Sequence, residues 1–152
     1  MLKQGSKAPK IELLDQNENP FSLASMGKKK VLVYFYPKAD TPGCTAQSCG
    51  LRDIADKIGR TVIVGVSPDK PSKQKKFDEK FELGFTLLAD TEHTVAEAFK
   101  VWKEKSMYGK KYMGTERTTF VIDAKGKIVA IFPKVKPGEH SDLVLKALKD
   151  LK

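Results

Sequence analysis

Residues 34–49 read YFYPKADTPGCTAQSC and take the chain from an apolar strand, through a short loop, into a helix. Pro37 ends the strand because its nitrogen carries no hydrogen with which to pair a neighbouring strand. Thr41 followed by Pro42 is typical of a helix start, with threonine as the N-cap and proline at the first helical position. The stretch therefore predicts a strand–loop–helix unit that presents Cys44 in the first helical turn.

The strand that opens this unit, Val31–Tyr36, is continuously apolar and rich in β-branched and aromatic residues. Continuous rather than alternating apolarity favours a central strand that is covered on both faces. Thr61–Val66 is a second strand of the same kind. Between them the helix is predicted to run to about Ile58 and to end at Gly59, with these residues near one face: Cys44, Leu51, Ile54, Ala55 and Ile58.

The rest of the chain adds shorter elements. The pattern predicts an N-terminal β-hairpin from Ile11–Leu14 and Phe21–Leu23, a helix from about Ser72 to Phe81, a short strand at Phe85–Leu88, a helix from Thr94 to Phe99 or Lys100, a loop over Lys103–Gly114, a hairpin from Thr118–Ile122 and Lys127–Phe132, and a final helix over Ser141–Leu151. In the final helix the residues expected to point inward are Leu143, Val144, Ala147, Leu148 and Leu151.

This order of elements predicts the fold class. Strands that alternate with helices, followed by a late antiparallel pair, indicate an α/β fold with a mixed central sheet flanked by helices. A thioredoxin-like fold satisfies this order, and a small doubly wound fold is the alternative. Because the chain has 152 residues and no repeat or linker, we expect one domain over residues 1–152.

Composition and charge exclude several classes of protein. The chain shows no signal-peptide pattern and no apolar run near the roughly 20 residues of a membrane span, so we expect a soluble cytoplasmic protein with no membrane partner. The net charge of +9 comes mostly from lysine, whereas phosphate and base recognition relies heavily on arginine. We therefore expect no nucleic acid partner, and a basic nucleic-acid-binding module is the weaker alternative.

A cysteine in the first turn of a helix has unusual chemistry. The unpaired amides and the dipole of a helix N-terminus favour an anion, so they would stabilise a thiolate at Cys44. We expect the Thr41 hydroxyl either to cap the helix or to donate to the sulfur. Pro42 and Gly43 keep side-chain bulk low beside the sulfur, which lets a small substrate approach. The alternative is an inert, buried cysteine at a helix start.

Cys49 lies five residues further along the same helix. In an ideal helix this spacing places the two Cα atoms roughly 8.7 Å apart, beyond the ~7 Å that a disulfide can bridge. Cys44 and Cys49 can therefore join only if the helix unwinds locally. Because a cytosolic compartment keeps thiols reduced, a redox role is favoured over a structural disulfide. The Cys-x-x-Cys motif of dithiol exchangers is absent, and His93 and His140 lie too far from the cysteines for a zinc motif.

The segment Tyr36–Thr45, YPKADTPGCT, resembles the active-site signature of the peroxiredoxins, in which proline, threonine and cysteine recur at this spacing. A second cysteine five residues later resembles the subgroup called peroxiredoxin Q or bacterioferritin comigratory protein. The later segment Gly114–Asp123, GTERTTFVID, resembles the part of that family that brings an arginine to the cysteine. Together the motifs extend the resemblance over nearly the whole chain.

The resemblance implies a thiol-dependent peroxidase that reduces hydrogen peroxide and organic hydroperoxides without a bound cofactor or metal. It implies that Cys44 is the peroxidatic cysteine and that Cys49 is the resolving cysteine, the two joining in a redox-active disulfide. Thr41, Pro37 and Arg117 would line the pocket. Thioredoxin or a similar dithiol would reduce the disulfide, and the resemblance favours a monomer.

Gln47 departs from the family pattern, in which many members carry glutamate three residues after the peroxidatic cysteine. Glutamine keeps the hydrogen-bonding capacity but loses the charge, so we expect activity to persist with altered peroxide affinity or pH dependence. The competing hypothesis for the chain is a thiol–disulfide exchange protein on the same fold. We expect His93, His140 and Trp102 to be cap, surface or core residues without a catalytic role.

Overall fold

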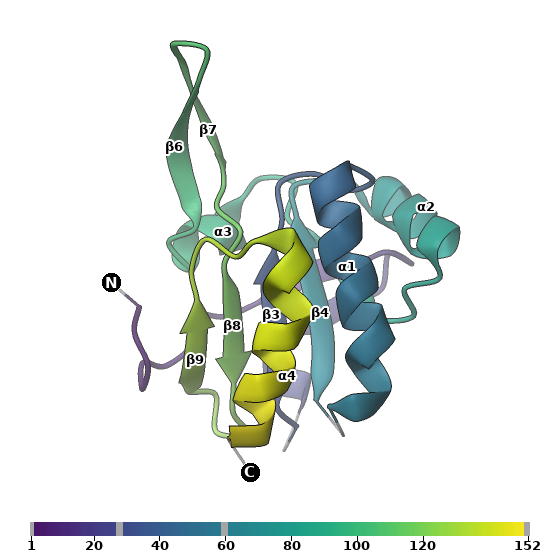
Figure 1. Ribbon diagram of the computed structural model, residues 1–152, viewed down its shortest axis with the longest axis vertical. Coiled ribbons are helices and arrows are strands. Elements are labelled where there is room, and N and C mark those ends of the chain that lie inside the picture. Colours follow the sequence, from purple (N-terminus) through teal and green to yellow (C-terminus); the bar gives the residue numbers. More distant parts are fainter. Residues whose placement is uncertain (1, 27–28, 59–60, 151–152) are drawn as a thin grey trace.

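The computed structural model describes residues 2–26, 29–58 and 61–150 (Figure 1). The strands are β1 (Glu12–Asp15), β2 (Pro20–Ser22), β3 (Val31–Phe35), β4 (Val62–Ser67), β5 (Thr86–Ala89), β6 (Trp102–Met107), β7 (Lys110–Thr115), β8 (Thr119–Ile122) and β9 (Ile128–Phe132). The helices are α1 (Pro42–Ile54), α2 (Pro71–Phe81), α3 (Thr94–Ala98) and α4 (His140–Asp150), with the 3₁₀ turns η1 (Leu23–Met26), η2 (Ala55–Lys57) and η3 (Pro137–Glu139).

The main sheet is mixed in direction. Among the described residues it has seven strands in the order β2-β1-β5-β4-β3-β8-β9, while β6 and β7 form a separate pair. β3 is parallel to β4 and antiparallel to β8. The N-terminal hairpin of β1 and β2 joins the sheet through β5. The predicted α/β architecture, with a mixed central sheet and an N-terminal β-hairpin, is therefore confirmed.

β3 is the centre of the core, and all five of its residues are buried. Because successive side chains of a strand point to opposite faces, β3 contributes to two layers of the core. On one face Val33 belongs to the same apolar cluster as Phe99, which follows α3. On the other face Leu32 belongs to the cluster that holds Leu51 of α1 and Val144 of α4. Figure 1 shows α1 and α4 covering the same face of the sheet, over β3 and β4.

Helix α1 is shorter than predicted. It begins after the extended N-cap Thr41, as expected, but ends at Ile54 rather than near Ile58. The turn η2 follows it, and such a tightening of the last turn is frequent at helix ends. Ala55 lies in that tighter turn and is exposed, contrary to the prediction that it shares the apolar face. The predicted stop at Gly59 lies outside the described residues.

Helix α4 begins at His140, directly after η3 and one residue earlier than predicted. Val144 and Leu148 are buried as expected, whereas Leu143 is 41% exposed. Leu143 precedes Val144 by one residue, and the rotation of about 100° between neighbouring residues takes it off the buried stripe. Leu151 lies outside the described residues.

The segment predicted as a loop, residues 103–114, is instead a hairpin formed by β6 and β7. At its tip Tyr108 and Gly109 have φ angles of 53° and 78°. Positive φ at both central residues is what a two-residue type I′ turn requires, and this turn matches the twist of paired strands. The sequence hides the strands because its many lysines leave no apolar alternation. In Figure 1 the hairpin projects away from the main sheet.

Candidate active site

The site forms at the edge of the sheet where β3 and β4 end. Because the two strands are parallel, the loops that follow them leave the sheet at the same edge. The first loop leads into α1 and the second into α2. β8 runs antiparallel to β3 with Thr119 opposite Tyr34, so the residues just before β8 also reach this edge. Arg117 thereby meets Cys44, although 73 residues separate them in the chain.

Cys44 is the third residue of α1, and its side chain is fully buried. Arg117 Nη1 lies 3.1 Å from the Cys44 sulfur and donates to it. The same nitrogen donates to Gln47 Oε1, on the next turn of α1, at 3.0 Å. The guanidinium is therefore held by two acceptors on one helix, with its permanent charge against the sulfur. That charge and the N-terminal end of α1 both attract negative charge to this position.

The backbone around Arg117 is fixed on both sides. The Arg117 carbonyl accepts from the Val135 amide at 2.8 Å, and the Glu116 amide donates to the Val101 carbonyl at 2.7 Å. The neighbouring Thr118 carbonyl accepts from the last residue of β3 at 3.0 Å. The guanidinium thus extends from a backbone position that several elements hold.

Lys105 of β6 brings a second positive charge near this site. Its side chain passes over Gly114, where an added Cβ would lie only 3.3 Å from the Lys105 Cδ, and its Nζ donates to the Thr115 carbonyl. Burial lowers the pKa of Lys105, and the nearby charge of Arg117 lowers it further, while interaction with Cys44 raises it. The base of the hairpin is therefore part of the electrostatic surroundings of Cys44.

Thr41 does not act as predicted. Its backbone is the N-cap of α1, but its hydroxyl makes no cap to the helix and instead donates to the Lys38 carbonyl at 2.9 Å. The expectation that this hydroxyl caps the helix or donates to the Cys44 sulfur is therefore wrong. The reason is local, because the loop turns sharply at Asp40, whose φ is 59°. The first-turn amides of α1 consequently remain available to an anion at the site.

The other residues predicted to contact substrate lie in the segment that leads to Cys44, from the end of β3 into the first turn of α1. Pro37 and Gly43 are half-buried and Pro42 is exposed. None of the three has a long side chain, so they leave room on their side of the cysteine.

Cys49 is half-buried and lies on α1, and both cysteines are free thiols. The helix is continuous from one cysteine to the other, so the ideal spacing of roughly 8.7 Å between their Cα atoms applies. A disulfide between Cys44 and Cys49 therefore requires α1 to open.

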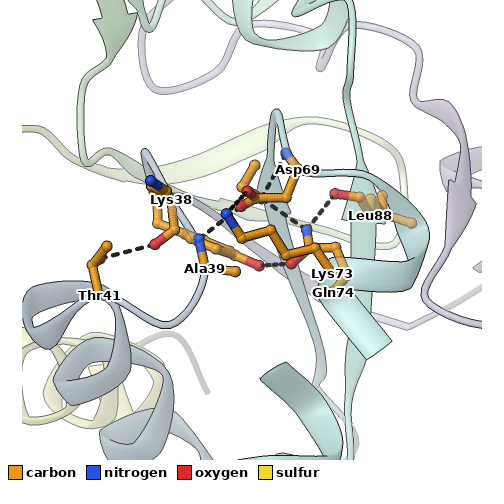
Figure 2. A network of polar contacts seen from close by, with 9 residues as sticks. Lys38, Ala39, Thr41, Asp69, Lys73, Gln74 and Leu88 are labelled. Atoms are coloured by element: carbon orange, nitrogen blue, oxygen red, sulfur yellow. Dashed lines mark hydrogen bonds and ion pairs between the residues drawn. The ribbon is translucent and has the colours of Figure 1, made fainter. Parts of the chain in front are cut away.

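Asp69, in the loop after β4, holds the loop that precedes Cys44 (Figure 2). Its Oδ2 atom accepts from the Ala39 amide and from the Ser67 hydroxyl, both at 2.7 Å. Lys73 Nζ lies 3.5 Å from the other carboxylate oxygen, and the Asp69 side chain is only 9% exposed. A largely buried carboxylate thus ties together the loops that follow β3 and β4.

Gln74 of α2 extends this network into the core (Figure 2). Its amide nitrogen donates to the Ser67 hydroxyl at 2.9 Å and to the Leu88 carbonyl at 2.8 Å. Its oxygen accepts from the Tyr36 hydroxyl at 2.5 Å. The sequence pattern predicts only a strand that ends at Val66 and a helix that begins at about Ser72, with no role for the residues between them. The available signal was that these polar residues follow a parallel strand beside β3, where ligand sites of such sheets occur.

A second polar group lies beneath α1. The Tyr34 hydroxyl and Ser48 Oγ share a hydrogen bond of 2.7 Å, and His140 Nε2 shares one of 2.7 Å with the Thr119 hydroxyl. His140 is fully buried, and its Nδ1 has no partner among the described residues. Burial lowers the pKa of His140 to about 4, with the charge of Arg117 adding to the shift. His140 is thus a neutral core residue.

Other candidate features do not converge on the site. His93 and Trp102 stack on each other, with ring centroids 4.0 Å apart and planes 3° apart. Within residues 2–26, 29–58 and 61–150, no three His, Cys, Asp or Glu side chains gather as a metal site would require. None of the helices in the same residues is long and apolar enough to cross a membrane.

Comparison with known families and curated proteins gives a consistent picture. The model of the AhpC/TSA family matches residues 4–131. Peroxiredoxin Bcp of Escherichia coli K12 is 50% identical over 151 residues, which span 98% of this chain and 97% of that protein. Peroxiredoxin Bcp of Bacillus subtilis 168 is 46% identical over 149 residues, which span 97% and 95% respectively.

Solved structures agree with this match. A bacterioferritin comigratory protein of Xanthomonas campestris, solved in trapped intermediate and ligand complexes that concern its alkyl peroxide reduction, superposes with a TM-score of 0.88 at 34% identity. The match covers 93% of this chain and 91% of that one. A cysteine-to-serine mutant of PrxQ from Xylella fastidiosa superposes with a TM-score of 0.92 at 27% identity, covering 99% and 98%. The thioredoxin-like fold predicted from the sequence is confirmed.

Proposed function

Because the chain belongs to the AhpC/TSA family of peroxiredoxins and is a thiol-dependent peroxidase, we propose that Cys44 is its peroxidatic thiol and Arg117 the charged partner of that thiol. The observation that carries this assignment is the 3.1 Å contact between Arg117 Nη1 and the Cys44 sulfur at the N-terminus of α1. Attack on a peroxide requires a thiolate, and this geometry lowers the energy of one. Gly43, which precedes Cys44 in the chain and has no side chain, supports entry of a small substrate.

In the first step the Cys44 thiolate attacks one peroxide oxygen. An S–O bond forms, the O–O bond breaks, and the departing oxygen leaves as water or an alcohol after taking a proton. Arg117 and the first-turn amides of α1 are donors for the negative charge that moves onto the departing oxygen. Cys44 is left as a sulfenic acid.

In the second step we assign Cys49 as the resolving thiol. Its thiolate attacks the Cys44 sulfur, so an S–S bond forms while the S–O bond breaks and the oxygen leaves as water. The position of both cysteines on α1 requires the helix to open first. The half-buried state of Cys49 supports a role in a step where the helix rearranges.

A thiol reductant then returns the disulfide to two thiols. We propose thioredoxin or a similar dithiol protein as that reductant, acting on a monomer in the cytoplasm. Pro42 and Gly43 complete the proposed substrate site beside Pro37 and Thr41, and their small exposed surfaces support access by both peroxide and reductant.

The test is peroxide-dependent oxidation of reduced thioredoxin by the parent protein, by Cys44→Ser and by Cys49→Ser. We expect Cys44→Ser to be inactive, because no other thiol lies against Arg117. Cys49→Ser should still consume one equivalent of peroxide per chain but fail to turn over with thioredoxin. Full turnover by Cys44→Ser would overturn the assignment of the peroxidatic thiol, and full turnover by Cys49→Ser would overturn only the resolving role.

A further inference from the structure

Helix α1 is fastened to the sheet in two different ways along its length. Between the two cysteines it is held by two hydrogen bonds, a partly buried one from Arg117 to Gln47 and a buried one between Ser48 and Tyr34. Further along, it is held by the buried apolar side chains of Leu51 and Ile54. Hydrogen bonds that break when the helix opens are replaced by hydrogen bonds to water, whereas exposed apolar surface finds no such replacement. The segment that must open is thus the one whose attachments can be exchanged for water.

Tyr34 is the fixed member of the Ser48 pair. It is the fourth of the five residues of β3 and is fully buried. Its ring stacks on Tyr36 with centroids 5.4 Å apart and meets the edge of Phe85 at 6.1 Å. Because the ring is packed in the sheet, its hydroxyl cannot follow α1 when the helix moves. Opening of the helix therefore breaks the bond to Ser48.

The Tyr34 hydroxyl also lies within electrostatic range of both thiols. Burial raises the pKa of Tyr34 far above its usual range, and the hydrogen bond with Ser48 opposes that shift. Interaction with Cys44 and with Cys49 raises it further. The phenol consequently stays protonated, and its partner Ser48 lies in the stretch of α1 from Cys44 to Cys49.

We propose that Tyr34 is a positioning residue for the resolving step, because its hydrogen bond to Ser48 sets how often α1 opens between Cys44 and Cys49. The proposal rests on the peroxidatic and resolving roles assigned above. When α1 opens, Ser48 leaves Tyr34, the Cys49 thiolate reaches the Cys44 sulfur, and the S–S bond replaces the S–O bond with release of water. The oxidising equivalents come from the sulfenic acid itself, so no further oxidant is needed.

The hydrogen bond between Tyr34 and Ser48 also affects how far the sulfenic acid is oxidised. While α1 stays closed, a second peroxide can oxidise Cys44 from sulfenic to sulfinic acid. Each opening of the helix instead offers the sulfenic acid to Cys49. A stronger attachment of Ser48 therefore lengthens the life of the sulfenic acid, and a weaker one shortens it.

The chain supplies a matched control for this role in Tyr36. It lies two residues along the same strand, is also fully buried, and its hydroxyl also donates to a buried side chain. Its partner, however, is Gln74 of α2 rather than a residue of α1. Tyr34→Phe and Tyr36→Phe each remove one buried phenol hydroxyl and keep the ring, but only the first removes a hydrogen bond made directly to α1.

The experiment follows single turnovers of the reduced protein with one equivalent of hydrogen peroxide. Acid quenching, alkylation and intact mass measurement separate thiol, sulfenic acid and disulfide at each time. Tyr34→Phe should form the disulfide roughly two- to tenfold faster than the parent, the effect of losing one net hydrogen bond in the closed helix. The peroxide concentration at which half of the protein carries Cys44 as a sulfinic acid should rise by the same factor. Tyr36→Phe should form the disulfide at the parent rate.

Ser48→Ala breaks the same hydrogen bond from the other side, because it leaves the buried Tyr34 hydroxyl without its partner. It should also accelerate disulfide formation. In the double variant Tyr34→Phe/Ser48→Ala the acceleration should be smaller than the product of the accelerations in the two single variants, because removal of both partners leaves no unpaired group. Equal acceleration by Tyr34→Phe and Tyr36→Phe, or exact additivity in the double variant, would overturn the proposal. Absence of the disulfide in the parent itself would instead overturn the assigned role of Cys49.

Discussion

Arg117 places one guanidinium nitrogen 3.1 Å from the Cys44 sulfur, and the same nitrogen donates to Gln47 on the helix that carries Cys44. The cation is therefore engaged with the sulfur and with the closed helix at once. If α1 opens, both contacts are lost together. The arrangement that activates Cys44 for peroxide is thus incompatible with the one that lets Cys49 reach it, so the two steps must alternate.

Replacement of Arg117 by lysine should slow the first step strongly. A lysine ammonium keeps the charge but loses the planar fork that holds both acceptors, and loss of such a donor costs roughly a hundredfold in rate. The measurement is the second-order rate of Cys44 oxidation by hydrogen peroxide. Arg52→Lys is the control, because Arg52 lies in α1 itself but contacts Asp53 and the Phe81 carbonyl rather than Cys44. Similar losses in both variants would contradict a specific role for Arg117.

Gln47 should act through its oxygen rather than through a charge. Gln47→Ala removes the second acceptor of Arg117 and should lower the rate of Cys44 oxidation by about tenfold, whereas Gln47→Glu keeps an acceptor and should stay close to the parent. Gln16→Ala is the control, since Gln16 is also a buried glutamine with hydrogen bonds to Asp78 and Phe85. It should lower thermal stability and leave the peroxide rate intact. A slow Gln47→Glu variant would show that the neutral amide itself is required.

Asp69 should matter to the first step although it does not touch Cys44. Asp69→Ala releases the Ala39 amide and with it the loop that leads into α1, so we expect the rate of Cys44 oxidation to fall by about tenfold. Asp123→Ala is the matched control. Asp123 also accepts two hydrogen bonds in a turn, from the Lys125 and Lys127 amides, but it lies away from the cysteine. If both variants lose stability but oxidise Cys44 at the rate of the parent protein, the role of Asp69 is only structural.

His140 should make the protein sensitive to acid. Its pKa is about 4 in the folded protein and 6.5 in the absence of the fold, so the unfolded chain binds a proton first as pH falls. The stabilisation is therefore complete above pH 6.5 and is lost progressively toward pH 4, by up to about 3 kcal/mol. Denaturant unfolding at a series of pH values measures the slope. His140→Gln should flatten it between these pH values, while His93→Gln should retain it because His140 is intact; a steep slope in His140→Gln would contradict this assignment.

Much of the fold could be predicted because the relevant signals are local. Continuous apolar runs such as Val31–Tyr36 indicate buried central strands, and Thr41–Pro42 marks a helix start wherever it occurs. The hairpin of β6 and β7 was missed because it lacks an apolar face, and its strands are held by backbone pairing and by the turn at Tyr108 and Gly109. The Thr41 hydroxyl was misassigned because its partner depends on the turn of the loop at Asp40.

The amino-acid sequence by itself determined that Cys44 begins a helix and that Cys49 lies too far along that helix to join it, since both follow from helix geometry. The family resemblance implied that Arg117 lies beside Cys44, and only the tertiary structure decided how Arg117 is held and which other groups surround the two cysteines. Arg117, Asp69 and Tyr34 reach α1 or its loop from other elements, because the parallel pairing of β3 with β4 and the antiparallel pairing with β8 bring their ends together. Contacts between such distant residues depend on strand register, which no local pattern encodes.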